Sequence, residues 1–224
     1  MKVLFVARLV SFKDPLMFVK AAKTLPEHKF IVAGDGTLMQ ECKRIASGNV
    51  VFYGWVLQEK VNELMDEADV FCQLSPFENI WSASLVQALK HGKAVVCTNA
   101  GYTASYLKHG VHVLLVPPND YVALAKTIKK LAVDDALRDF LGRNAGRYVA
   151  ENLSVPHITL QIHNLLVETV RKWNGNRNRV LSAKFKIKCS MNGCMNSCAA
   201  CMKQVAERET HACFNVELIE LHER

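Results

Sequence analysis

Six short apolar runs alternate with longer amphipathic stretches through residues 1–174, and this alternation limits the fold more than any other feature. The runs lie at residues 3–6, 29–32, 50–53, 70–73, 94–98 and 113–116, and helical patterns lie at 14–24, 38–46, 59–67, 84–91 and 121–132. Strands that alternate with helices at this spacing indicate βαβ units. The runs are apolar throughout, as strands buried on both faces must be. We therefore predict an α/β fold with a doubly wound, Rossmann-like parallel sheet.

The pattern changes to helix alone after the sixth run, with helical periodicity at residues 134–151 and 156–173. A polar, turn-rich stretch follows at residues 174–179. We expect one domain at residues 1–174, a basic linker at 175–188 and a cysteine-rich tail at 189–224. The linker is predicted because it carries several basic side chains and no acidic one.

The chain is basic, with a formal net charge of +7 and 22% charged residues. This balance admits anionic partners such as nucleotides, phospholipid headgroups or nucleic acid, without selecting one of them. No apolar run approaches the roughly 20 residues that cross a bilayer. The N-terminus also lacks the apolar core of a signal peptide. We expect a cytoplasmic protein, either free or attached peripherally to a membrane.

Ligands of a doubly wound sheet bind at the carboxyl ends of its strands, so the loops after the strands are the candidate sites. The loop after the first run carries Arg8 and Lys13 and leads into a helix that Pro15 would begin. Two cations beside a helix N-terminus could hold a diphosphate. Solvated surface charges are the alternative, because Lys and Arg side chains are mostly exposed.

The loops after the second and third runs offer weaker signals. Gly34 and Gly36 flank Asp35, and glycines permit positive φ and the close approach of a ligand to the backbone. A tight strand-to-helix turn would need the same residues. Trp55 follows the third run and could lie near a base, although packing in the core is the more common role of a lone Trp.

The loop after the fourth run extends from Ser75 into a helical pattern and contains Glu78. The small, hydroxylated residues at 82–84 suit a helix N-terminus, where unpaired backbone amides can face an anion. Glu78 could reach a sugar hydroxyl or oppose a developing positive charge. It could equally interact with the dipole of the helix that follows.

Taken in this order, the loops resemble the C-terminal, donor-binding domain of glycosyltransferase family 4, the group 1 glycosyl transferases of the GT-B fold. The resemblance covers about residues 3–173. Besides the Arg8 to Lys13 loop and the Gly34 to Gly36 turn, it rests on residues 51–54, 68–70, 75–78, 87–89, 92–96 and 116–120. In that family this domain binds a nucleotide-diphosphate sugar. The enzyme transfers the sugar to a glycan or lipid acceptor and retains its anomeric configuration.

The resemblance implies roles for individual residues. Arg8 and Lys13 would hold the diphosphate and stabilise it as a leaving group, and Glu78 would lie near the transferred sugar, so that these three form the catalytic set. Gln87 falls where the family's second glutamate receives the ribose hydroxyls. The other implied binding residues are Gly34, Trp55, Asn79, Ile80, Trp81 and Ser82. The family's transfer reaction requires no cofactor here, and no nucleic-acid partner is expected.

The sequence departs from the family pattern at three points. Gln87 replaces a glutamate and lacks the charge-assisted hydrogen bond of a carboxylate. The interval from Glu78 to Gln87 is one residue longer than usual, and residues 100–103 lack the family's Gly-Gly pair and the acid that follows it. An inactive remnant that still binds a nucleotide sugar is therefore the alternative to an active transferase.

The family's enzymes also have an N-terminal domain that binds the acceptor, whereas this chain begins at the first strand of the donor half. Because such sites form at domain interfaces, we expect the acceptor-binding half to be supplied in trans, by a separate domain or subunit. The helix predicted at 156–173 matches the segment that returns to that half.

The eight cysteines fall into two groups. Cys72 and Cys97 lie in apolar runs and are predicted to be small core residues. Cys194, Cys198 and Cys201, in the tail, share the spacing of the cluster-binding loop of radical S-adenosylmethionine enzymes, which makes a [4Fe–4S] cluster one candidate. Zinc bound by four of the Cys and His residues of the tail is a second candidate. A tail that binds no metal is the third.

Overall fold

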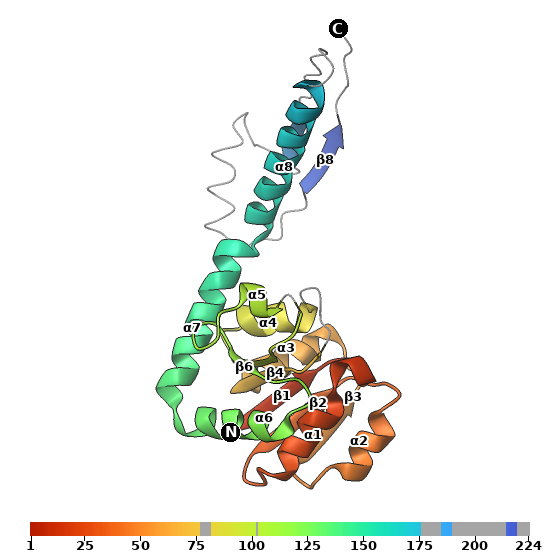
Figure 1. The fold of residues 1–224 in the computed structure, drawn as a ribbon. Coiled ribbons are helices and arrows are strands. Elements are labelled where there is room, and N and C mark those ends of the chain that lie inside the picture. Colours follow the sequence, from red (N-terminus) through yellow and green to blue (C-terminus); the bar gives the residue numbers. More distant parts are fainter. Residues whose placement is uncertain (77–81, 102, 176–184, 190–213, 219–224) are drawn as a thin grey trace. The chain divides into compact units, whose positions relative to one another are not determined.

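The computed structural model describes residues 1–76, 82–101, 103–175, 185–189 and 214–218. They belong to two compact units, Met1–Glu151 and Asn152–Arg224, both drawn in Figure 1. The composition break at residues 174–179 therefore lies inside the second unit. The first unit carries the predicted sheet and the described part of the candidate site.

Six parallel strands form the sheet of the first unit. They are β1 (Lys2–Val6), β2 (Lys29–Ala33), β3 (Val50–Gly54), β4 (Val70–Gln73), β5 (Ala94–Thr98) and β6 (Leu114–Val116). Their order across the sheet is β3-β2-β1-β4-β5-β6. Val3 of β1 has Phe30 of β2 on one side and Val70 of β4 on the other. The predicted doubly wound α/β fold is confirmed, and every predicted strand is present within one residue of its expected ends.

Helices cover both faces of this sheet (Figure 1). On one face α1 (Pro15–Lys23) contacts α2 (Met39–Ile45) and α6 (Tyr121–Val133), and on the other face lie α3 (Gln58–Glu67) and α4 (Ala83–Lys90). The long helix α7 (Asp135–Asn152) follows α6. Two short elements were not predicted, the 3-10 turn η1 (Ser11–Lys13) and α5 (Thr103–Tyr106), since one turn is too short to show periodicity.

Successive strand residues face opposite sides of the sheet and divide the buried side chains into two layers. Val3 and Phe5 of β1 pack in the cluster that includes Phe18 of α1, whereas the equally buried Leu4 lies outside that cluster. The Phe18 ring centroid is 5.3 Å from that of Phe5 and 5.2 Å from that of Phe30. Burial of such large side chains on both faces stabilises the sheet and fixes where its strand ends lie.

Cys42, Cys72 and Cys97 are buried in the first unit with free thiols. The prediction that Cys72 and Cys97 are core residues is confirmed. Burial raises the pKa of Cys42 to about 11 and also raises the pKa values of Cys72 and Cys97. These thiols stay protonated at neutral pH and are therefore unreactive.

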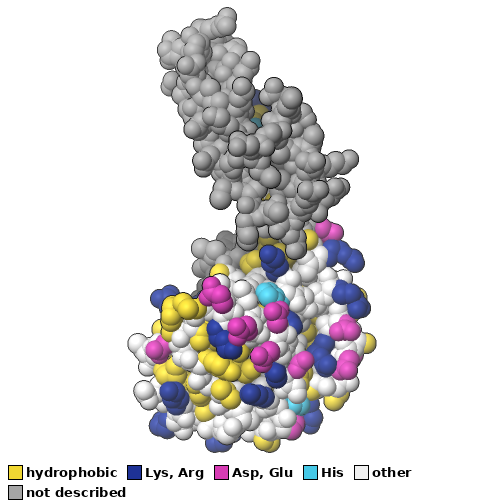
Figure 2. Space-filling view, turned by 180° about the vertical axis from the view of Figure 1, so that it is seen from behind, with side chains coloured by type: hydrophobic (Ala, Val, Ile, Leu, Met, Phe, Trp, Pro, Cys, Tyr) yellow, Lys and Arg dark blue, Asp and Glu magenta, His cyan; other side chains and the backbone are white. Residues whose placement is uncertain are grey.

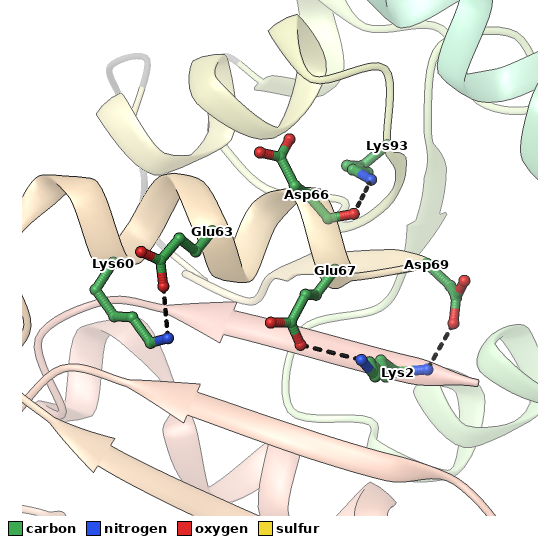
Figure 3. Close-up of polar contacts among 7 residues, drawn as sticks. All are labelled: Lys2, Lys60, Glu63, Asp66, Glu67, Asp69 and Lys93. Atoms are coloured by element: carbon green, nitrogen blue, oxygen red, sulfur yellow. Dashed lines mark hydrogen bonds and ion pairs between the residues drawn. The ribbon is translucent and has the colours of Figure 1, made fainter.

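Charged side chains at the amino ends of β1, β4 and β5 have partners (Figure 3). The Lys2 ammonium lies 3.0 Å from a Glu67 carboxylate oxygen, and the Lys2 backbone nitrogen donates to Asp69 at 2.7 Å. Lys93 donates to the backbone carbonyl of Asp66 at 2.9 Å. On the face that Figure 2 shows, Lys and Arg side chains also lie among Asp and Glu side chains, so the positive charge of the chain is not gathered there.

The second unit contains α8 (Val155–Gly175) and an antiparallel pair of strands, β7 (Phe185–Cys189) and β8 (Phe214–Leu218). Residues 185–188, which the sequence assigns to the basic linker, form most of β7. In the sequence of β7, Phe185 and Ile187 alternate with lysines. In the part of the chain that the structure describes, no helix, α8 included, is long and apolar enough to span a bilayer.

Candidate nucleotide-sugar site

The order of the strands reverses between β1 and β4, which are neighbours in the sheet although β2 and β3 separate them in the chain. The loops that leave the carboxyl ends of β1 and β4 therefore diverge. Such a switch point is where doubly wound sheets bind ligands. The loop after β1 carries Arg8 and Lys13, and the loop after β4 begins at Leu74 and Ser75.

In the sequence, Arg8 precedes Phe12 and Lys13 follows it. Both side chains contact the Phe12 ring. The Arg8 guanidinium carbon is 5.5 Å from the ring centroid and the Lys13 ammonium nitrogen is 5.4 Å from it. Such cation–π contacts are attractive and hold each cation over the ring. Arg8 is exposed and the Phe12 side chain is 40% exposed. The structure thus gathers the two predicted cations around one aromatic side chain at the switch point.

Asp14 and Pro15 end this loop and begin α1. Asp14 takes a left-handed conformation (φ 46°), and its carboxylate accepts a hydrogen bond from the Met17 backbone nitrogen at 3.0 Å. Pro15 is the first helical residue, where its fixed φ suits the helix and its missing N–H costs nothing. Burial raises the pKa of Asp14, against the smaller lowering effects of the Met17 hydrogen bond and Lys20. The expected helix start at Pro15 is confirmed.

Ser75 joins the loop after β4 to the loop after β1. The Ser75 hydroxyl donates to the Phe12 carbonyl at 2.6 Å, and the Ser75 carbonyl accepts from the hydroxyl of Thr98 at 2.6 Å. Ser75 and Thr98 are each only 3% exposed. A chain of two hydrogen bonds thus runs along the carboxyl ends of β5, β4 and β1.

The Gly34 to Gly36 turn supports the loop after β1 from the other side. A β-carbon on Gly34 (φ 133°) would lie 1.9 Å from the Ala7 carbonyl oxygen, and one on Gly36 would lie 2.5 Å from the Leu9 oxygen. The Leu9 nitrogen donates to the Asp35 carbonyl at 2.9 Å. On the side of Gly34 where a β-carbon would lie, the group that approaches closely is therefore the Ala7 carbonyl of the chain itself.

Trp55 follows β3, and its side chain is 72% exposed. The interpretation of Trp55 as a core residue is wrong. Because β3 is at the edge of the sheet, a residue beyond its end has neighbours on one side only. Gly54 is adjacent to the glycine turn, since its carbonyl accepts from the Gly34 nitrogen at 2.6 Å. Trp55 therefore stands at the carboxyl edge of the sheet with an exposed indole.

The helix start predicted at residues 82–84 is confirmed, with Ser82 at the N-cap position of α4, although its side chain makes no capping hydrogen bond. The Ser82 and Ser84 hydroxyl oxygens are 2.8 Å apart. Gln87, further along α4, donates from its amide nitrogen to the side-chain oxygen of Asn62 on α3. The structure places Gln87 against α3.

Several predicted residues lie outside the described part of the chain. These are Glu78, Asn79, Ile80 and Trp81, and in the tail Cys194, Cys198 and Cys201. Among the residues that are described, no cluster of three or more His, Cys, Asp and Glu side chains could hold a metal ion. The catalytic role of Glu78 and the metal-binding tail therefore stay predictions.

Phe12, Ser75 and Thr98 belong to this region and were not predicted as site residues. Phe12 could have been found as the aromatic residue between two cations that close the same loop. Ser75 and Thr98 each stand where an apolar strand meets a loop, which is where polar side chains first reach the carboxyl edge. Their mutual contact depends on the adjacency of β4 and β5 and has no local sequence signal.

The family model for glycosyl transferases group 1 matches residues 1–134, which include the whole sheet and the loops described above. The chain belongs to this family. Its α/β unit is the glycosyltransferase domain of the GT-B type that the sequence resemblance indicated.

Curated glycosyltransferases are also similar to this chain. The α-1,4-N-acetyl-D-galactosaminyltransferase of Campylobacter jejuni, which acts on a saccharide linked to PP-undecaprenol, is 32% identical over 74% of this chain and 48% of its own length. A 2-deoxystreptamine N-acetyl-D-glucosaminyltransferase of Niallia circulans is 29% identical over 62% of this chain and 38% of its own length. The chain thus spans about half the length, or less, of these curated relatives.

Solved structures agree on the fold. HepE of Anabaena, crystallised with UDP, superimposes with a TM-score of 0.68 at 24% identity, over 75% of this chain and 48% of HepE. The C-terminal domain of LpcC, a group 1 glycosyl transferase of Francisella tularensis, superimposes with a TM-score of 0.60 at 20% identity, over 69% of this chain and 87% of that domain.

Proposed function

We propose that the first unit binds the donor of a glycosyl transfer, a nucleoside-diphosphate sugar, at the carboxyl edge of its sheet. The observation that carries this proposal is the position of Arg8 and Lys13, both within about 5.5 Å of the Phe12 ring centroid and directly before the N-terminus of α1. Two cations and the amides of a helix start are the groups that proteins use to bind phosphate. That HepE binds UDP supports the same choice of ligand.

In the proposed reaction the acceptor oxygen forms a bond to the anomeric carbon of the sugar while the bond from that carbon to the diphosphate breaks, and the acceptor's hydroxyl proton passes to the departing diphosphate. The leaving nucleoside diphosphate gains negative charge, which Arg8 and Lys13 would stabilise. Glu78 would lie beside the sugar. We propose retention of configuration, because the names of the relatives specify α-linked products, which retention gives from an α-linked donor.

Gln87 would accept a ribose hydroxyl through its side-chain oxygen. Its amide nitrogen is already engaged by Asn62, which orients the side chain so that the oxygen is the atom left for the ligand. Gln thereby replaces a glutamate with a neutral acceptor, whose hydrogen bond is weaker than that of a carboxylate. The exposed indole of Trp55 would contact the base.

The acceptor would be a glycan or a lipid-linked saccharide, as the name of the Campylobacter jejuni relative states for that enzyme. We propose that the acceptor-binding half comes from another domain or subunit, since this chain matches about half of each relative. A transfer assay distinguishes an enzyme from an inactive donor-binding remnant. Only the enzyme transfers the sugar to an acceptor when a partner half is added.

The binding site is tested by titrating UDP-, GDP- and ADP-sugars against the thermal stability of the full chain. A ligand of the native state raises the stability by about 2.7 kcal/mol at 100 times its dissociation constant. Arg8→Ala and Lys13→Ala should each weaken binding of the matching donor about tenfold or more, since each removes a charge-assisted contact. Lys23→Ala, an exposed position at the far end of α1, is the matched control. Equal affinities in all four proteins would refute the site.

A further inference from the structure

The cation loop, defined here as residues 8–13, is tied to the sheet from two sides. On the side of β2, the Leu9 nitrogen donates to Asp35 at 2.9 Å and the Leu9 carbonyl accepts from Leu38 at 2.9 Å. On the side of β4, the Phe12 carbonyl accepts from the Ser75 hydroxyl at 2.6 Å. The first tie holds the half of the loop that carries Arg8, and the second holds the half that carries Lys13.

Ser75 is held in turn from β5. Its carbonyl accepts from the Thr98 hydroxyl, and both side chains are almost completely buried. A buried hydroxyl that can make only one good hydrogen bond has a fixed direction, and its acceptor is fixed with it. The position of the Phe12 backbone is therefore set by a contact that starts two strands away.

We propose that Ser75 is a positioning residue for the diphosphate: through the Phe12 carbonyl it keeps Arg8 and Lys13 near the same ring, with Thr98 fixing Ser75. This inference rests on the proposed function. Ser75 does not contact the ligand in this proposal. It places the two cations that would contact the diphosphate.

Electrostatics gives the reason such a restraint is needed. Arg8 and Lys13 carry like charges and lie near the same ring, so each adds to the electrostatic cost of holding the other there. A loop without the Ser75 bond would be freer to place the two cations differently. The ligand would then have to bring them together again, and its affinity would fall by the free energy of that rearrangement.

The first test measures hydrogen exchange and needs no ligand. Ser75→Ala and Thr98→Val remove one hydroxyl each, while Thr98→Ser keeps it. The control Thr127→Val removes a hydroxyl that donates to Ala123 at 2.9 Å within α6. We expect faster exchange at residues 8–13 in Ser75→Ala and Thr98→Val, and wild-type exchange there in Thr98→Ser and Thr127→Val. Unchanged exchange at residues 8–13 in Ser75→Ala would overturn the proposal.

The second test compares the affinities of UDP and UMP by calorimetry. If Ser75 positions the cations for the diphosphate, Ser75→Ala should weaken UDP about tenfold, which is about 1.4 kcal/mol, and UMP less than twofold. Thr98→Val should weaken UDP by a smaller factor, and Thr98→Ser should restore it. A residue that only stabilises the fold would lower the melting temperature and leave the ratio of the two affinities unchanged, and that result would overturn the inference.

The two proposals fail in different ways. If UDP binds the wild type and Arg8→Ala with the same affinity, the proposed site is wrong whatever Ser75 does. If UDP binding depends on Arg8 but the ratio of UDP to UMP affinity is the same in Ser75→Ala and the wild type, the site stands and the role of Ser75 is wrong. The exchange measurement decides the structural half of the inference in both cases.

Discussion

Gly142 of α7 meets Gly92, the residue just after the turn that ends α4, at backbone contact distance. A β-carbon on Gly142 would lie 2.0 Å from the Gly92 carbonyl oxygen. Gly146, one helical turn later, is less constrained, because its β-carbon would lie 3.7 Å from the Leu89 oxygen. The helix can approach this closely only because Gly142 has no side chain.

Gly142→Ala should destabilise the first unit by about 1–3 kcal/mol, because the atom that the new methyl meets is backbone and cannot rotate away. Gly146→Ala is the matched control and should be neutral or stabilising by up to about 1 kcal/mol, since Ala favours a helix over Gly. Urea unfolding followed by circular dichroism measures both. Equal effects of the two substitutions would show that α7 does not pack on Gly92 as described.

Position 14 requires a side chain that accepts a hydrogen bond from the Met17 nitrogen and a residue that tolerates a positive φ. Asp14→Ala loses both and should cost about 1–2 kcal/mol of unfolding free energy. Asp14→Asn keeps both and should cost less than about 0.5 kcal/mol. Burial raises the pKa of Asp14, so the neutral amide also avoids the cost of burying a charge.

The control for Asp14 is Asp120, which caps α6 by accepting from the Ala123 nitrogen at 2.8 Å, with an ordinary φ of −106°. Asp120→Ala loses a cap alone and should cost about 1 kcal/mol. Thermal melts of the four proteins measure the differences. A loss in Asp14→Asn as large as that in Asp14→Ala would contradict the assigned role.

His112 should make the fold sensitive to acid. Its Nδ1 accepts from the Lys108 nitrogen at 3.2 Å and its ring centroid is 4.8 Å from that of Tyr148. Burial, with a smaller contribution from Lys108, lowers the pKa of His112, so folding favours the neutral ring. The stabilisation is complete above the unfolded pKa of about 6.5 and is lost as pH falls below it toward the lower folded value.

The measurement is unfolding free energy between pH 7.5 and pH 5. His112→Asn keeps an acceptor that does not titrate, so its free energy should fall less with pH than that of the wild type, although it is lower at pH 7.5. Parallel curves for the two proteins would show that His112 does not contribute to the acid sensitivity.

The sheet and its helices could be predicted because each strand is apolar on both faces and each helix has one apolar face. The Ser75 to Thr98 contact could not, because these residues are brought together by the order of the strands. The choice between a binding and a core position for Trp55 also depends on the strand order, since only that order shows that β3 is an edge strand. Arg8 and Lys13 could be named as candidates because one loop holds both of them.

The central claim is that Arg8 and Lys13 hold a diphosphate, and phosphorus NMR of UDP reports on that contact most directly. Titration of UDP with the wild-type chain should shift or broaden both phosphorus resonances. The double variant Arg8→Ala, Lys13→Ala should leave them close to their positions in solution, while Lys23→Ala should behave as the wild type. Equal perturbation by the wild type and the double variant, or none by the wild type, would contradict the account.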